Sequence, residues 1–130
     1  MNIRQLQLDD LILYSGKVCR VTAVRLDNDG KVRAVVENDD FCGFVDESEP
    51  IPLTEAILEK NGFVLIDEKE KMYRLNLAED ESVCVTADFK CEEPFVHVRN
   101  TCYQATPYCR YVHQLQHALR LCGIEMKIEL

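Results

Sequence analysis

The block from Thr106 to Leu130 has the clearest periodicity in this sequence, and it limits the kinds of fold that the chain can adopt. Thr106 and Pro107 are typical of a helix start, and Gly123 is typical of the position just beyond a helix end. Between them, apolar residues fall on one side of a helical wheel: Tyr108, Tyr111, Val112, Leu115, Ala118, Leu119 and Cys122. The block therefore predicts one long helix whose apolar face packs on a core.

The residues after Gly123 have a different period. Apolar residues alternate there with charged ones, and the apolar positions are Ile124, Met126, Ile128 and Leu130. An alternation of period two is typical of a half-buried strand. We expect the chain to leave the helix at Gly123, with Leu119 touching Ile124, and to continue as a final strand.

Residues 1–50 contain short runs of strand-forming residues separated by turn sequences. The turn sequences are Ser15-Gly16, Asp27-Asn-Asp-Gly30 and Asn38-Asp-Asp40. They bound predicted strands at residues 10–14, 17–26, 31–37 and 41–45. Short strands joined by tight turns favour a small SH3-like barrel or a strongly bent antiparallel sheet. Gly43, inside the last run, predicts a bulge or a sharp bend.

Residues 46–53 are acidic and contain two prolines, so they are the candidate linker between two lobes. Beyond them, Thr54 predicts the N-cap of a short helix that ends at Asn61-Gly62. Leu53 and Leu58 are placed for a hydrophobic staple across this cap. Further strands are predicted at residues 63–66, 72–77, 82–87 and 95–99, before the long helix.

Together these elements place the chain in the α+β class. The expectation is a small β lobe at residues 1–50 followed, in one compact unit, by an α+β lobe at residues 51–130. In the second lobe, an antiparallel sheet is packed by the one long C-terminal helix, and the chain ends in a strand.

Cysteine usage and charge limit the setting in which the protein works. The chain has 130 residues and seven cysteines, with no Cys-x-x-Cys pair, and its first residues lack an apolar signal segment. We therefore expect reduced, buried thiols, a cytoplasmic location, and neither a metal nor another cofactor. No apolar run reaches the length of a membrane span. The net charge of −8 argues against nucleic acid or an anionic membrane as a partner.

Acidic residues are absent between residues 94 and 124, although the sequence contains 23 of them. Four arginine and histidine residues of the predicted helix fall on the side opposite its apolar stripe: Arg110, His113, His117 and Arg120. On an acidic molecule they form a cationic strip. We expect this strip to dock a protein partner, the acidic edge of another copy, or the first half of the chain itself.

Cys109, His113 and His117 permit a second interpretation, because they recur every four residues along the predicted helix. Such a set can hold a metal ion, with Cys102 or His97 as a further ligand, or place a thiol beside an imidazole. Against it, this side faces away from the apolar stripe, and the segment has no carboxylate to orient the imidazoles. A metal- or thiol-dependent activity centred on these residues is therefore the alternative, and no catalytic residue is assigned.

Tyr14, Phe41 and Phe44 are a third candidate, at the strand ends of the first lobe. Aromatic side chains in such positions bind a peptide or nucleic acid, or else belong to the core. The acidic turns beside them would repel phosphate, so a peptide is the favoured ligand of these three residues.

Leu11–Val24, Ile51–Phe63 and above all Tyr111–Ile124, with its VHQLQHAL run, are distinctive segments. They resemble a group of uncharacterised proteins of gut Bacteroides-type bacteria and their phages. The resemblance implies a bacterial cytoplasmic or phage-encoded protein and brings no activity, cofactor or catalytic residue. The sequence thus predicts a non-enzymatic interaction or accessory protein whose contact face is the exposed side of the C-terminal helix.

Overall fold

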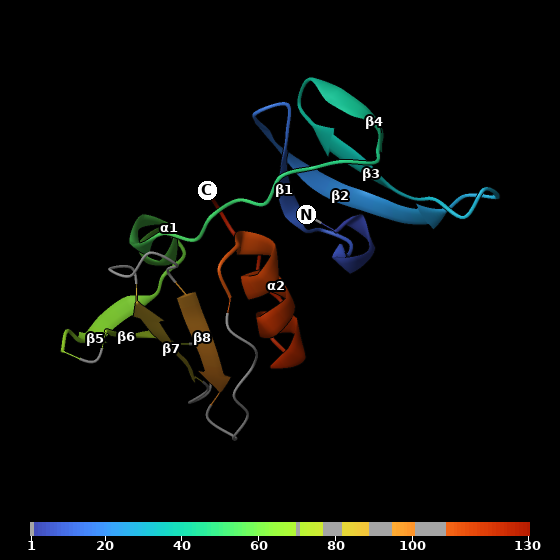
Figure 1. Ribbon diagram of the computed structural model, residues 1–130. Coiled ribbons are helices and arrows are strands. Elements are labelled where there is room, and N and C mark those ends of the chain that lie inside the picture. Colours follow the sequence, from blue (N-terminus) through green and yellow to red (C-terminus); the bar gives the residue numbers. More distant parts are fainter. Residues whose placement is uncertain (1, 70, 77–81, 89–94, 101–108) are drawn as a thin grey trace. The chain divides into compact units, whose positions relative to one another are not determined.

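The computed structural model describes residues 2–69, 71–76, 82–88, 95–100 and 109–130. The chain forms two compact units, Met1–Ile51 and Pro52–Leu130. Each unit contains its own four-stranded antiparallel sheet, and the described part of the second unit adds two α-helices (Figure 1). The fold is therefore α+β, as the sequence predicts. The division lies one residue from the boundary expected at the acidic linker.

The first unit is a meander of four strands that follows a short 3-10 helix, η1 (Ile3–Gln5). The strands are β1 (Leu11–Tyr14), β2 (Lys17–Leu26), β3 (Val32–Asn38) and β4 (Phe41–Val45), and each pairs with the next. Ser15 and Gly16 both have positive φ and close the two-residue turn between β1 and β2. In the next turn, the Gly30 N–H donates to the Asp27 carbonyl at 3.0 Å. All four predicted strands are confirmed.

The core of the first unit lies on one face of this sheet. It gathers alternate residues of the strands and two residues from η1 and the loop after it: Ile3, Leu6, Ile12, Cys19, Val21, Ala34, Val36 and Val45. The pairing of β2 with β3 shifts register between Val21 and Ala23. A bulge at this point increases the local twist and bends the strand, so the core face curves.

The two edges of the first sheet differ. Beyond β4 the chain returns to β1, where Leu13 and Glu49 exchange both backbone hydrogen bonds, at 2.8 and 2.9 Å. This return covers the β1 edge, whereas β4 pairs with β3 alone within the first unit, which is described from residue 2 onward. The β3–β4 register runs unshifted through Gly43, so the bulge predicted at this glycine is absent. Among the described strands, β4 is therefore the free edge of this sheet.

The second unit has the order helix, four strands, helix. Its elements are α1 (Glu55–Lys60), β5 (Val64–Asp67), β6 (Met72–Asn76), β7 (Ser82–Asp88), β8 (Phe95–Asn100) and α2 (Val112–Leu121). The strands pair in chain order, so the predicted antiparallel sheet is confirmed. α2 lies beside β8 (Figure 1). The largest buried side chains described in this unit are Tyr73, Phe63, Leu58, Leu115 and Leu119.

Both helices end on the same glycine motif. Gly62 and Gly123 have φ values of +88° and +76°, a conformation that strains any residue with a side chain. The N–H of the following residue then donates back to a carbonyl in the last helical turn, from Phe63 to Leu58 at 3.0 Å and from Ile124 to Leu119 at 2.9 Å. These bonds confirm both predicted helix stops.

The start of α1 is also as predicted. The Thr54 side-chain oxygen accepts from the Ile57 N–H at 3.2 Å, which satisfies one of the unpaired donors of the first turn. Leu53, just before the cap, and Leu58, one turn into the helix, are both buried. This is the arrangement expected of a hydrophobic staple.

α2 starts later than predicted, at Val112. The predicted cap Thr106 lies outside the described residues, and Cys109 and Arg110 precede the helix. The backbone there pairs with the segment before α1, since the Leu53 N–H donates to the Arg110 carbonyl at 3.0 Å. Backbone that is extended and paired in this way cannot also form a helical turn.

Residues 124–130 form no strand with the described part of the chain, which corrects the predicted final strand. The alternation survives in the exposure of the side chains, and Ile128 is buried. In place of a neighbouring strand, the Asn61 side chain accepts from the Glu129 N–H and donates to its carbonyl, at 2.7 Å each. The Lys60 ammonium donates to the Leu130 carbonyl. Side chains at the end of α1 thus hold this segment.

Candidate functional site

The four residues predicted as a cationic strip do not share one exposed face. Arg110 precedes α2 and is exposed, whereas His113, in the first turn, exposes only 3% of its surface. His117 and Arg120 are half-buried. The helical-wheel prediction assumed that α2 is covered along its apolar stripe alone, but Gln116 is buried as well. The four residues therefore differ in exposure, and a contact at this strip stays a prediction.

The imidazoles of α2 pack among aromatic rings. The His113 ring stacks on Tyr111, with centroids 6.0 Å and planes 7° apart, and meets the His117 ring edge-on at 5.7 Å. In the described part of the chain, no three His, Cys, Asp or Glu side chains are grouped as a metal site requires. The further ligand candidates, Cys102 and the side chain of His97, lie outside that part.

Cys109 is buried, and its surroundings suppress ionisation. Burial raises the pKa of the Cys109 thiol to about 12, so the thiolate is a minor form near neutral pH. A nucleophilic cysteine needs the thiolate, which a helix N-terminus or an adjacent cation would favour. Because Cys109 precedes α2 instead of lying in its first turn, the predicted helix placement is wrong. Both observations count against a thiol-dependent activity at this residue.

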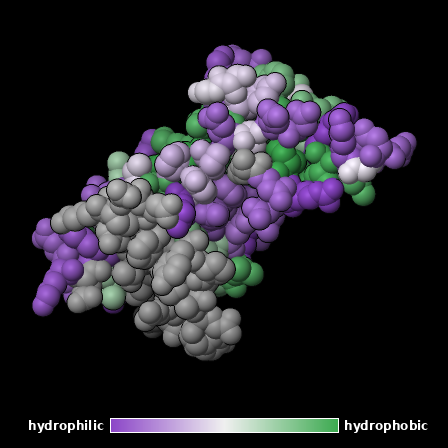
Figure 2. All heavy atoms as spheres, viewed as in Figure 1, coloured by the Kyte–Doolittle hydropathy of each residue, from purple (hydrophilic) through white to green (hydrophobic). Residues whose placement is uncertain are grey.

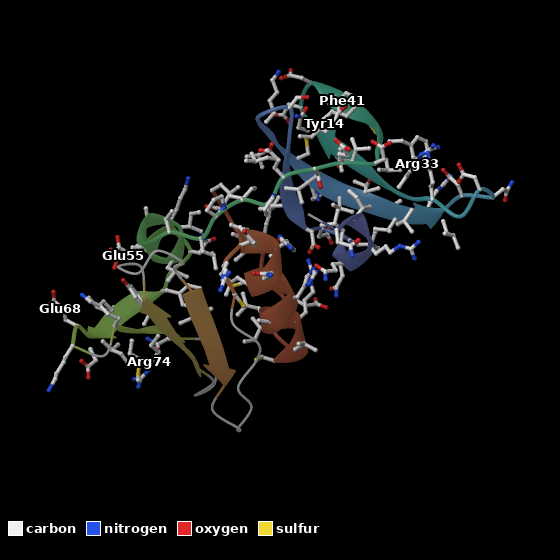
Figure 3. All side chains as sticks on the ribbon, viewed as in Figure 1. Tyr14, Arg33, Phe41, Glu55, Glu68 and Arg74 are labelled. Atoms are coloured by element: carbon white, nitrogen blue, oxygen red, sulfur yellow. The ribbon has the colours of Figure 1, made fainter. Side chains whose placement is uncertain are left out.

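Two of the three candidate aromatic residues lie together at one end of the first sheet. Tyr14, from the end of β1, stacks on Phe41, from the start of β4, with ring centroids 5.5 Å apart and planes 21° apart (Figure 3). Tyr14 is half-buried against the core, and Phe41 remains 39% exposed. The exposed part of the Phe41 ring is thus apolar surface, and the Tyr14 ring packs against it.

Phe44 belongs to a different surface. Successive side chains of a strand point to opposite faces, so Phe44 lies on the outer face of the sheet and Phe41 on the core face. Phe44 is 56% exposed, and the Arg25 guanidinium lies over its ring, 5.9 Å from the centroid. The predicted cluster of three is therefore a stacked pair on one face and a cation–π pair on the other.

Gly43 makes room for the Phe41 ring. A β-carbon built on Gly43 would lie 2.8 Å from Cζ of Phe41, closer than two such carbons can approach. The ring thus leans along its own strand over the glycine. The sequence signal for this packing is the Phe-x-Gly spacing, because residues two apart share one face of a strand. The position of Gly43 inside a strand predicted a bulge or a sharp bend, so its role in packing Phe41 was missed.

β4 presents backbone groups along its free edge. Asn38 and Phe41 flank a two-residue turn and form a hydrogen-bonded pair. In an antiparallel ladder, hydrogen-bonded and non-hydrogen-bonded pairs alternate, so the next pair, Glu37 and Cys42, is non-hydrogen-bonded. The N–H and C=O groups of Cys42 and Phe44 therefore point away from β3. These groups are the ones that an added strand would bond.

Acidic residues flank this edge at both ends. Asp39 and Asp40 precede β4, Asp46 and Glu47 follow it, and all four are exposed. The Lys17 ammonium nitrogen lies 3.9 Å from a carboxylate oxygen of Asp40. Both side chains are largely exposed, so this ion pair contributes little to stability. The strand between them, FCGFV, carries no charge. The free edge is thus an apolar strand between two negatively charged ends.

A second apolar edge belongs to the second unit. Three consecutive residues of β5 are exposed: Val64, Leu65 and Ile66. In the view of Figure 2, most of the hydrophobic residues (green) that reach the surface belong to the first unit and lie among hydrophilic ones (purple), so the exposure of β5 is taken from its residues alone. The pairing of β5 with β6 shifts register between Leu65 and Asp67, and such a bulge spaces the outward backbone groups unevenly. β4, which pairs in register over its whole length, is the stronger candidate.

Comparisons with protein-family models, with curated proteins and with solved structures find no match to this chain. Neither described helix has the length and apolar character needed to cross a membrane. The function is therefore inferred from the geometry of the described residues.

Proposed function

We propose that the protein is a non-enzymatic interaction module that binds an extended segment of a partner protein at β4 and the Tyr14–Phe41 pair. One observation carries the proposal: a partly exposed, stacked aromatic pair lies at the end of a sheet edge that pairs with no other strand of its unit. Extended peptides bind such edges through main-chain hydrogen bonds, and neighbouring apolar surface selects their side chains. The contact face thus moves from α2 to the first unit.

The charge of this surface favours a protein partner over nucleic acid. Exposed carboxylates border β4 at both ends, and the whole chain has a net charge of −8. Phosphate groups brought to this edge would meet negative charge at short range. A polypeptide, in contrast, can supply apolar side chains to the aromatic pair and basic side chains to the carboxylates.

The shape and the setting of the module are further parts of the proposal. After β4 the chain returns to β1, where Glu49 pairs with Leu13. A small barrel needs such a return, so this pairing supports an SH3-like first unit. A bacterial cytoplasmic or phage-encoded setting is supported by the resemblance of Tyr111–Ile124 and by the cysteine content of the sequence.

Selection from a random-peptide display library on the immobilised full-length protein tests the proposed function. Phe41→Ser removes the partly exposed ring. The matched control is Leu26→Ser, which removes an exposed apolar side chain at the last residue of β2. We expect wild type to enrich related peptides that bind Phe41→Ser at least about tenfold more weakly and Leu26→Ser equally well. Circular dichroism verifies that both variants fold.

Two outcomes would contradict the proposal. In one, no related family of peptides is enriched by the wild-type protein. In the other, Phe41→Ser retains the enriched peptides with unchanged affinity although its fold is intact, which would place their binding surface elsewhere.

A further inference from the structure

We infer, resting on the function proposed above, that the partner segment adds to β4 as a fifth strand and carries basic residues on both sides of an apolar centre. The inference joins two independent observations: the backbone groups that β4 directs outward, and the exposed acids at each of its ends. It also excludes a second copy of this chain as the occupant of the edge.

Among the described residues, the backbone of β4 has unpaired hydrogen-bonding groups in the positions that an added strand requires. Cys42 and Phe44 direct their N–H and C=O groups to the free edge, so an added strand can form a regular ladder with them. No register shift interrupts β4, and no proline or charged residue within it blocks pairing. Its position at the edge of the first sheet is visible in Figure 1.

The side chains of β4 select an apolar centre. An added strand lies beside Phe41 on the core face and beside Phe44 on the outer face, and both rings are partly exposed. Cross-strand pairs of aromatic and β-branched residues stabilise neighbouring strands. Valine, isoleucine or threonine opposite β4 would cover these rings, whereas a charged residue there would lose solvent without gaining a partner.

The acidic residues at the two ends of β4 favour basic residues at both ends of the partner segment and disfavour a second copy of this chain. In an antiparallel pair of two β4 strands centred on Gly43, the turn with Asp39 and Asp40 of one copy comes beside Asp46 and Glu47 of the other. In a parallel pair, each acid lies opposite its own equivalent. Like charges placed opposite each other on neighbouring strands are destabilising. Lysine or arginine at the same positions of a partner would be attracted instead.

Fluorescence anisotropy with two designed peptides tests this inference. The first, Lys-Lys-Val-Thr-Val-Thr-Val-Lys-Lys, has basic ends, and the second has glutamate in place of every lysine. Full-length Cys42→Pro lacks one N–H that faces the free edge and keeps the ladder to β3, while Cys42→Ser is its matched control. We expect the basic peptide to bind wild type and Cys42→Ser alike, and to bind Cys42→Pro at least about tenfold more weakly.

A second variant tests the charges without touching the strand. Asp39→Lys combined with Asp46→Lys places one cation at each end of β4, on exposed positions. We expect this variant to lose the preference for the basic peptide and to favour the acidic one. It keeps the inference testable even where Cys42→Pro fails to fold.

Three results would overturn the inference. They are equal binding of the two peptides to wild type, undiminished binding to a folded Cys42→Pro, and a wild-type dimer at neutral pH in sedimentation that Cys42→Pro abolishes. The last result would make a second copy the occupant. The proposed function has its own test, the affinity of the display-selected peptides for Phe41→Ser. If those peptides still bind Phe41→Ser more weakly than wild type, the proposed function stands, and only the strand addition and the charge preference are refuted.

Discussion

At the scale of single residues, the packing of Phe41 over Gly43 gives the first prediction. Gly43→Ala places a methyl group where the Phe41 ring lies, so the ring must rotate away from Tyr14. We expect the nuclear Overhauser contacts between the two rings to disappear, and the peptides selected by display to bind more weakly. Losing the aromatic contact should lower the free energy of unfolding by about 0.5 to 1.5 kcal/mol, whereas replacing a strand glycine should raise it by about 0.5 to 1 kcal/mol. The two effects therefore largely cancel in stability.

The control is the same substitution in a Phe41→Leu background. There the ring is gone, so Gly43→Ala should only stabilise the folded state in urea unfolding. Ring contacts that persist unchanged in Gly43→Ala would show that Phe41 does not depend on the glycine.

Two cysteines give a second prediction at this scale. Cys42 is exposed and Cys109 is buried. Burial raises the pKa of the Cys109 thiol to about 12 from an ordinary value of 9.0. Native protein at pH 8 should therefore react quickly with a thiol reagent at Cys42 and slowly at Cys109, as peptide mass mapping can measure. Fast labelling of Cys109 in native protein would contradict its buried position and revive the thiol-dependent alternative.

The sign of the accompanying pH effect follows from the same pKa. Because the pKa of Cys109 is raised in the folded state, its contribution to stability is fully present below about pH 9 and is lost as the pH rises toward 12. Cys109→Ala should flatten this part of the stability curve, as urea unfolding at pH 8 and pH 11 can show.

At the scale of elements, Asn61 joins the end of α1 to the last residues of the described chain. Its amide donates to the Ile57 carbonyl and exchanges two hydrogen bonds with the backbone of Glu129, all at 2.7 Å. Asn61→Ala removes these bonds and should destabilise the folded state by about 1 to 3 kcal/mol in urea unfolding. Lys60→Ala, which removes only the bond to Leu130, is the milder control.

Hydrogen exchange locates the same effect. The Glu129 amide should exchange faster in Asn61→Ala than in wild type and Lys60→Ala, since it loses its acceptor. Equal protection in all three proteins would show that the segment is held by other means, such as the burial of Ile128.

The elements also show which structural features a sequence can predict. The strands of the first unit and both helix stops were predicted because their signals are local: Ser15-Gly16 closes a turn by itself, and Gly62 permits the stop that ends α1. The start of α2 and the predicted final strand failed because their partners are distant. Arg110 pairs with Leu53, and Glu129 pairs with a side chain instead of a strand.

The candidate site was predictable only in part, for the same physical reason. Tyr14 and Phe41 were recognisable as aromatic residues at strand ends, but their contact depends on the way the meander brings β1 and β4 to one end. Helical periodicity placed His113 opposite the apolar stripe. It carries no information on whether that second side is also covered, and His113 is buried.

At the scale of the whole molecule, negative charge is shared between the two units. Residues 1–51 contain six Lys and Arg against ten Asp and Glu, and residues 52–130 contain nine against thirteen. Each unit thus has a net charge of −4, and four acids of the first unit flank its free edge. We expect this charge of one sign to oppose pairing between the β4 edges of two copies.

Lowering the pH should remove this protection. As the pH falls toward the isoelectric point of about 4.8, carboxylates gain protons and the repulsion between two β4 edges weakens. We expect wild type and Cys42→Ser to be monomeric at pH 7.5 and to associate reversibly near pH 5 in sedimentation velocity, while Cys42→Pro associates less because one edge-facing N–H is missing. Circular dichroism at both pH values separates association of folded protein from acid unfolding. Equal association of Cys42→Ser and Cys42→Pro near pH 5 would mean that another surface, such as the exposed apolar residues of β5, forms the contact.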